Sequence, residues 1–195
     1  MKRLLVLLLV TIAATTMVSA QLKDKPAGVP IDPTKFPSVP DLILNSPLVK
    51  QDGSPLTLNS YRGNFVLLTL WATWAKPVEA QTQFLVETQE KYGSAGLTII
   101  GLNVGNGNGS KEKKDTIEKF ADKFKVNFDL VEEFSFGTTT DAIYNLTRFN
   151  GIPQALLIDR EGKLRGVFLG GGDRVIKVEK QLVEDLMKEK QPVAQ

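Results

Sequence analysis

The feature that most constrains the fold is the segment Phe65-Val-Leu-Leu-Thr-Leu-Trp71, which is almost entirely apolar. A run of this kind, without polar alternation, is typical of a strand buried on both faces of a sheet. A helix is predicted to begin directly after it, around Ala75 to Pro77, because proline is well tolerated in the first turn of a helix. A buried strand that leads directly into a helix predicts an α/β protein.

The rest of the chain alternates between the apolar patterns of strands and of helices. Gly93 ends the first predicted helix, and Gly105 to Ser110 is a predicted loop. Asp173 is a candidate N-cap for the last helix. This order predicts a central mixed β-sheet flanked by helices on both faces. The predicted strands are residues 97–104, 128–131, 155–159 and 163–169; the predicted helices are residues 116–124, 137–146 and a C-terminal segment with Val175, Val178, Leu182 and Leu186 on its apolar face.

A short β-hairpin is predicted before the central sheet. Asp52-Gly53 is a turn signal, and it separates Leu42-Ile43-Leu44 from Leu56-Thr57-Leu58. Two apolar runs joined by such a turn are typical of paired antiparallel strands. The sequence therefore predicts an N-terminal hairpin extension with these two runs as its strands.

The first residues have the pattern of a secretory signal peptide. Lys2 and Arg3 precede an apolar stretch, and Val18-Ser-Ala20 is a small-residue cleavage site. The protein is therefore predicted to be exported, either periplasmic or secreted, and to contact a membrane only if this segment is retained. The next segment is rich in proline and lacks periodicity, which predicts a linker. The predicted division is a signal peptide (residues 1–20), a proline-rich linker (21–37), a domain (38–190) and a tail (191–195).

The composition excludes several classes of function. Removal of Lys2 and Arg3 from the 24 basic residues leaves 22, against 22 acidic residues, so the exported chain carries no charge excess for nucleic acid. The mixed run Lys111-Glu-Lys-Lys-Asp115 is predicted to be a solvated helix face. The chain has no histidine and no cysteine, which argues against a metal site, haem or a Ser-His-Asp triad. No cofactor is predicted.

Several short motifs follow one another along the chain. They are Pro40-Asp-Leu42, Asp52-Gly53, Gly63, Trp71-Ala-Thr-Trp74, Gly151-Ile-Pro153 and Leu157-Ile-Asp159 with Gly162. With these motifs in this order, the chain resembles the thioredoxin-like superfamily, and most of all its exported thiol-disulfide oxidoreductases of the redoxin (alkyl hydroperoxide reductase–thiol-specific antioxidant) type. The resemblance covers about residues 38–190 and implies a thioredoxin-like fold.

The chain departs from this family at the residues that carry its chemistry. The resemblance implies a Cys-x-x-Cys motif after the tryptophan, with the first thiolate stabilised at a helix N-terminus. Ala75 and Val78 stand at these two positions, so thiol–disulfide exchange by this chain alone is excluded. Relatives often carry an acidic residue at the position of Gln81. A neutral amide there is what a site without a resolving thiol would tolerate.

The resemblance also implies a candidate binding site. Pro153 matches the family's cis-proline, and the residue before it pairs in relatives with an extended substrate peptide. The candidate binding residues are therefore Trp74, Lys76, Pro77, Ile152 and Pro153. The alternative is that Pro153 is retained only because the fold needs the turn. Trp71 is expected in the core and Trp74 at the rim of the site.

Three functional hypotheses follow from these residues. The first is an exported thioredoxin-fold protein without intrinsic thiol redox activity, which binds a peptide or protein partner near Trp74 and Pro153. The second is an oxidoreductase or antioxidant that acts by a non-thiol or partner-assisted route. The third is a structural module tethered by its proline-rich arm.

Overall fold

One mixed β-sheet forms the centre of the computed structural model, which describes residues 29–30, 38–135 and 137–189. Its strands are β1 (Val29–Pro30), β2 (Leu48–Lys50), β3 (Pro55–Leu56), β4 (Phe65–Trp71), β5 (Leu97–Asn103), β6 (Asp129–Glu133), β7 (Gln154–Ile158) and β8 (Leu164–Leu169). Their order across the sheet is β1-β8-β7-β4-β5-β6-β2-β3. The pairs β4–β5 and β5–β6 are parallel and the other pairs are antiparallel.

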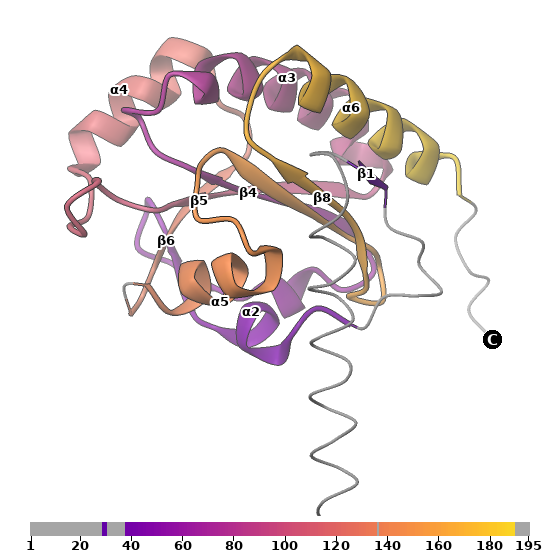
Figure 1. The fold of residues 1–195 in the computed structure, drawn as a ribbon, viewed down its shortest axis with the longest axis horizontal. Coiled ribbons are helices and arrows are strands. Elements are labelled where there is room, and N and C mark those ends of the chain that lie inside the picture. Colours follow the sequence, from indigo (N-terminus) through magenta and orange to yellow (C-terminus); the bar gives the residue numbers. More distant parts are fainter. Residues whose placement is uncertain (1–28, 31–37, 136, 190–195) are drawn as a thin grey trace, which may run out of the picture.

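Helices cover both faces of this sheet, as predicted. The helices are α2 (Asp41–Asn45), α3 (Pro77–Tyr92), α4 (Lys114–Phe124), α5 (Thr138–Thr147) and α6 (Asp173–Met187), with short 3₁₀ turns at Leu58–Tyr61 and Gly93–Ala95. Figure 1 shows α3, α4 and α6 in one layer and α2 and α5 in the opposite layer. This architecture confirms the predicted fold class.

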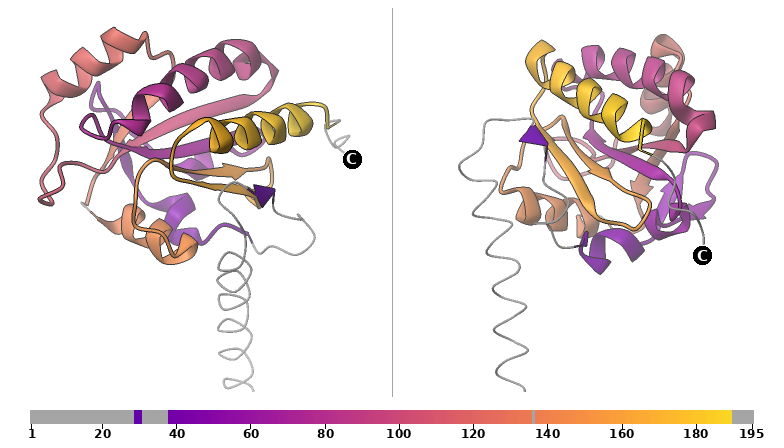
Figure 2. Two further views of the ribbon diagram at one scale, coloured as in Figure 1. Left: turned by 45° about the horizontal axis from the view of Figure 1, so that its top comes forward. Right: turned by 90° about the vertical axis from the view of Figure 1, so that its right-hand side faces the viewer.

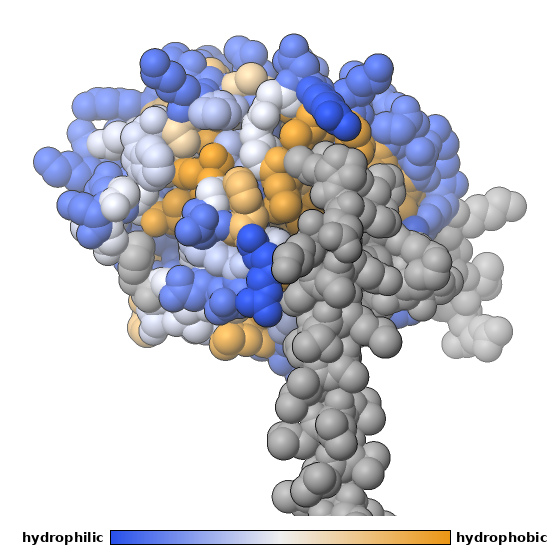
Figure 3. All heavy atoms as spheres, in the orientation of Figure 1, coloured by the Kyte–Doolittle hydropathy of each residue, from blue (hydrophilic) through white to orange (hydrophobic). Residues whose placement is uncertain are grey.

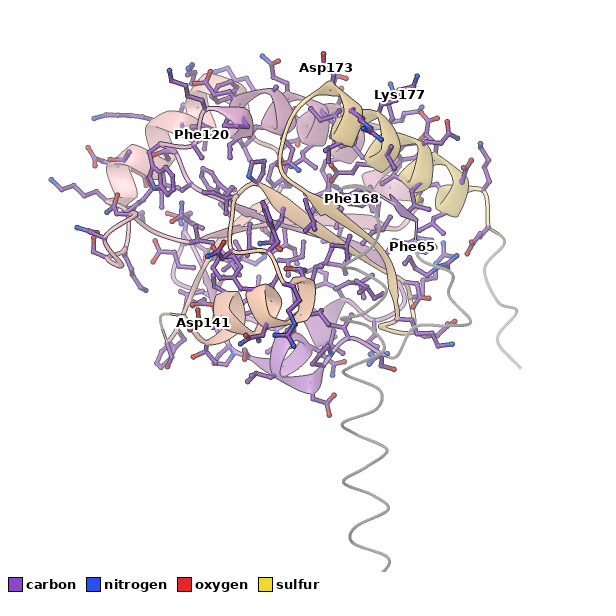
Figure 4. The ribbon with its side chains drawn as sticks, viewed as in Figure 1. Phe65, Phe120, Asp141, Phe168, Asp173 and Lys177 are labelled. Atoms are coloured by element: carbon purple, nitrogen blue, oxygen red, sulfur yellow. The ribbon has the colours of Figure 1, made fainter. Side chains whose placement is uncertain are left out.

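Strand β4 is the centre of the core, and all its residues are buried. Because side chains alternate along a strand, β4 contributes to apolar clusters on both faces of the sheet. Phe65 and Leu67 pack with residues of α3 and α6 on one face, where Phe168 also lies (Figure 4). Leu68 and Leu70 pack with residues of α2 and α5 on the other face. The alternation therefore decides which side chains of β4 face the helix layer that contains α3.

The predicted N-terminal hairpin exists, but one of its strands was wrongly placed. Leu42-Ile43-Leu44 belongs to helix α2, and the hairpin pairs β2 with β3, with Leu48 opposite Leu56. Gly53 has φ 86°, a conformation that the turn requires and glycine adopts freely. A run of three apolar residues is too short to distinguish a strand from one helical turn. Here Pro40 is the N-cap of α2, and its carbonyl accepts hydrogen bonds from the Ile43 and Leu44 N–H groups. The side chains of Ile43 and Leu44 are buried.

The last helix begins one residue earlier than predicted. Its N-cap is Gly172, and Asp173 lies in the first turn without a side-chain capping bond (Figure 4). A carboxylate in the first turn still interacts favourably with the positive end of the helix dipole. The buried face consists of Val175, Glu179, Val183 and Leu186. The predicted Val178 and Leu182 are only half-buried and pack at its border.

The predicted signal peptide (residues 1–20) and tail (191–195) lie outside the described residues. Within the predicted linker, Val29–Pro30 is described, and it pairs with β8 at the edge of the sheet (Figure 2). A second contact lies nearby, where Ser38 bridges to Lys163. Among the described residues, no helix combines the length and the apolar character needed to cross a membrane.

Candidate functional site

The candidate site lies where β4 passes into α3. The turn is closed by backbone bonds from the Ala75 N–H to the Ala72 carbonyl (3.2 Å) and from the Val78 N–H to the Ala75 carbonyl (2.9 Å). Ala75 and Val78 are only 6% and 2% exposed, and both belong to an apolar cluster with Trp71.

Helix α4 closes this cluster from the outside. Ile117 and Phe120 (labelled in Figure 4) are buried in it. The rings of Trp71 and Phe120 lie 5.0 Å apart at their centroids. The two positions where the resemblance implies sulfur are therefore filled by hydrocarbon in a packed core. Nothing at these positions can accept or donate electrons.

Trp74 differs sharply from Trp71 in exposure. Trp71 is 3% exposed, whereas Trp74 is 53% exposed, as expected for a rim residue. The Trp74 indole is nevertheless fixed, because its Nε1–H donates to the Gly105 carbonyl at 3.0 Å. A large apolar ring that is both exposed and held in place is suited to contacting a partner.

A buried carboxylate holds the loop that carries Trp74. Glu112 accepts hydrogen bonds from the Thr73 N–H (3.1 Å), the Thr73 hydroxyl (2.5 Å) and the Asn103 Nδ2–H (2.6 Å). Asn103 in turn accepts from the Gly105 N–H at 2.8 Å. Sequence reasoning missed this network, because Glu112 lies in the run predicted to be a solvated helix face. That prediction was wrong for Glu112, which is 6% exposed and precedes α4.

Ile152 and Pro153 form the second side of the site. Their peptide bond is cis, as the resemblance implied. Ile152 packs against the cluster that contains Ala75 and Val78. The Pro153 carbonyl accepts from the Gly170 N–H at 2.9 Å, whereas within the described part of the chain no hydrogen bond reaches the Ile152 backbone. The N–H and C=O of Ile152 therefore have no hydrogen-bond partner within the described part of the chain.

Gly171 joins the two sides. A Cβ atom on Gly171 would lie 2.6 Å from the Pro77 Cβ and 3.2 Å from the Pro153 Cγ, so only glycine fits between the two prolines. The structure thus brings together Ala75, Val78 and Ile152 in one cluster, and Pro77 and Pro153 around Gly171. Lys76 is exposed at the N-cap of α3.

The face that carries these loops is partly apolar. Figure 3 shows apolar surface gathered between the layer of α3, α4 and α6 and the smaller helix α5. Within the described residues, no group of His, Cys, Asp or Glu side chains is placed to hold a metal ion. The site therefore offers an aromatic ring, free backbone groups and hydrocarbon.

A buried carboxyl of α6, that of Glu179, also lies beneath the site, beside Gln81 of α3. The Gln81 Nε2–H donates to Glu179 Oε2 at 3.4 Å, and Glu179 Oε1 has no partner among the described residues. Burial raises the pKa of the Glu179 carboxyl to about 8, and the Gln81 hydrogen bond lowers it only in part. Position 81 lacks a carboxylate, but α6 supplies one beside it. Glu179 follows Val175 by four residues, so its place on the apolar face was the signal that could have revealed it.

The fold and the sulfur-free junction together define a thioredoxin-fold protein of the thiol-disulfide oxidoreductase type in which the reactive cysteines are replaced. The chain belongs to the redoxin family, whose Redoxin model matches residues 32–182.

Curated relatives agree with this class, and solved structures agree with its fold. The chain is 29% identical over 168 residues to the thiol-disulfide oxidoreductase ResA of Geobacillus thermodenitrificans, covering 86% of each chain. It is 30% identical over 133 residues to ResA of Geobacillus kaustophilus, covering 68% of each. A putative thiol:disulfide interchange protein DsbE from Chlorobium tepidum has a TM-score of 0.62 at 21% identity, over 77% of this chain and 95% of that one. A putative protein disulfide isomerase from Bacteroides thetaiotaomicron has a TM-score of 0.60 at 25% identity, over 73% and 86%.

Proposed function

We propose that this chain is an exported redoxin-family protein that lacks thiol redox activity of its own and binds an extended segment of a protein partner. One juxtaposition carries the proposal. The exposed Trp74 directly precedes Ala75, and the side chain of Ala75 packs in the cluster that Ile152 contacts. The backbone groups of Ile152 are unpaired within the described chain.

These features match a known mode of peptide recognition. An extended peptide can pair its main chain with free backbone N–H and C=O groups, and neighbouring pockets or rings then select its side chains. Ile152 supplies the backbone groups, and the Trp74 ring supplies apolar area that an apolar side chain of the peptide would cover. Lys76 and Pro77 border this surface at the start of α3. The ligand class is therefore an extended peptide with an apolar residue opposite Trp74.

Peptide binding is tested with an array of extended peptides that is probed with the purified protein, followed by titration of the best labelled peptide. Trp74→Ala is expected to weaken binding about tenfold or more, because it removes the exposed ring. Leu42→Ala is the matched control, since Leu42 is 55% exposed on α2, in the opposite helix layer. Equal affinity of the two variants would contradict the proposal.

The absence of redox activity is tested by insulin disulfide reduction with dithiothreitol as the electron source. We expect no catalysis above the background rate, because the chain has no sulfur nucleophile. Clear catalysis would refute this part of the proposal. The double reversion Ala75→Cys, Val78→Cys is expected to gain activity, with a depressed pKa for the thiol introduced at position 75.

Export is tested on the full chain with a C-terminal tag. A mature protein that begins at Gln21 in the exported fraction supports cleavage after Ala20. Recovery of the unprocessed chain with membranes would instead support a retained anchor.

A further inference from the structure

Strand β8 would form the edge of the sheet if β1 were absent. Val29 pairs with Val167 and Pro30 with Gly166, in antiparallel register. At the other end of β8, the Val39 N–H donates to the Gly162 carbonyl at 3.0 Å. An uncovered edge strand presents unpaired backbone groups to any other strand, so the segment at β1 acts as a cover.

The cover is short and weak. Only Val29 of the two β1 residues has a backbone N–H, because proline has none. Because β1 belongs to the same chain as β8, its pairing is maintained by effective concentration more than by bond strength.

We propose that the β8 edge is a latent docking site for a second copy of this chain, which β1 keeps closed in the monomer. Two antiparallel β8 strands are self-complementary about a twofold axis, as symmetric dimers require. A register centred on Val167 pairs residues 165–169 with the same segment of the copy, compared with the two residues that β1 covers.

The charges near β8 permit this pairing. Arg165 is the charged residue of the strand, and its guanidinium lies 2.6 Å from Glu189 and 3.6 Å from Asp159. Because the Arg165 charge is neutralised in each copy, two adjacent β8 strands do not repel each other as two unpaired cations would. Val167 and Phe168 are buried within each sheet, so the contact between copies consists of backbone hydrogen bonds.

The test compares Val29→Pro with Val29→Thr in sedimentation velocity over a range of protein concentrations. Val29→Pro removes the remaining N–H of β1, whereas Val29→Thr retains it in a good strand-forming residue. We expect Val29→Pro to dimerise about tenfold more tightly or more, because each dimer displaces two β1 segments and each of these has lost one ladder hydrogen bond. A Val29→Pro protein that remains monomeric at every concentration would overturn the proposal.

Disulfide crosslinking tests whether the dimer forms through β8, because the chain has no native cysteine to compete with an introduced one. In Val29→Pro/Val167→Cys, oxidation is expected to link dimers through position 167, which the proposed register brings close to its copy. Dimers that do not crosslink there would use another surface and would refute the proposal. Oxidised Val29→Cys/Val167→Cys, in which β1 is fixed to β8, is expected to stay monomeric; dimerisation of this locked protein would equally count against it.

Discussion

At the scale of single residues, Glu179 couples stability to pH. A carboxyl whose pKa is higher in the folded than in the unfolded protein favours folding while it is protonated. Its contribution is complete below the unfolded value of 4.5 and is lost as the pH rises to about 8. Across this window the loss is about 1.4 kcal/mol per pH unit, because the unfolded chain releases a proton that the folded chain keeps.

Glu179→Gln is therefore expected to stabilise the protein increasingly between pH 4.5 and pH 8, and by a constant amount above that. The amide keeps the shape of the side chain but cannot ionise. Urea unfolding of both proteins across this pH range measures the difference in free energy. Parallel stability curves would show that Glu179 is ionised in the folded protein. Glu184→Gln is the control, because this carboxylate of α6 is 27% exposed and lies 3.5 Å from the Lys91 Nζ.

At the scale of elements, the reliability of sequence reasoning followed the length and context of each pattern. Strand β4 and helix α3 were predicted closely, because a long apolar run and an N-terminal proline leave few alternatives. Leu42-Ile43-Leu44 was assigned to the wrong element, because three apolar residues fit a strand or one helical turn and tertiary packing decides. Glu112 could not be identified from its neighbours, because its partner Thr73 lies 39 residues away and its partner Asn103 lies at the end of β5.

The same distinction applies to the candidate site. Its positions Ala75, Val78 and Pro153 were located from motif order, and the structure places Ala75 and Val78 together with Ile152 in one apolar cluster. Gly171 is needed because the loop after β8 passes close to Pro77 and Pro153. No local sequence pattern predicts such a close approach between distant segments. Glu179 illustrates a third case, because its spacing from Val175 fits the buried face of α6 whereas its charge argues against burial.

The loop between β8 and α6 gives a prediction at the element scale. Gly171→Ala places a methyl group 2.6 Å from the Pro77 Cβ, so the loop must move away from the prolines. We expect a loss of about 1–3 kcal/mol in the free energy of unfolding and weaker peptide binding. Gly107→Ala is the control, because nothing lies within 4 Å of a Cβ there. Thermal unfolding and peptide titration measure both effects; identical behaviour of the two variants would contradict the packing argument.

At the scale of the whole molecule, stability comes from packing without any covalent cross-link. The chain contains no cysteine, and the sheet is covered by helices on both faces. We expect the midpoint of thermal unfolding to be the same with and without dithiothreitol. The reduced double revertant Ala75→Cys, Val78→Cys is expected to be less stable by about 1 kcal/mol, because Val78 loses buried hydrocarbon. Calorimetry under both conditions tests this, and a shift of the unaltered protein with reductant would contradict it.

The contrast between the two tryptophans gives the protein two internal optical reporters. Trp71 is buried in an apolar cluster beside Phe120, so its fluorescence should be blue-shifted and should move to longer wavelength only when the fold opens. Trp74 is exposed to water, so its emission should shift to shorter wavelength when a ligand covers the ring. Each signal can be isolated with Trp74→Phe or Trp71→Phe. Occupancy of the site and integrity of the core can therefore be followed separately in one unlabelled sample.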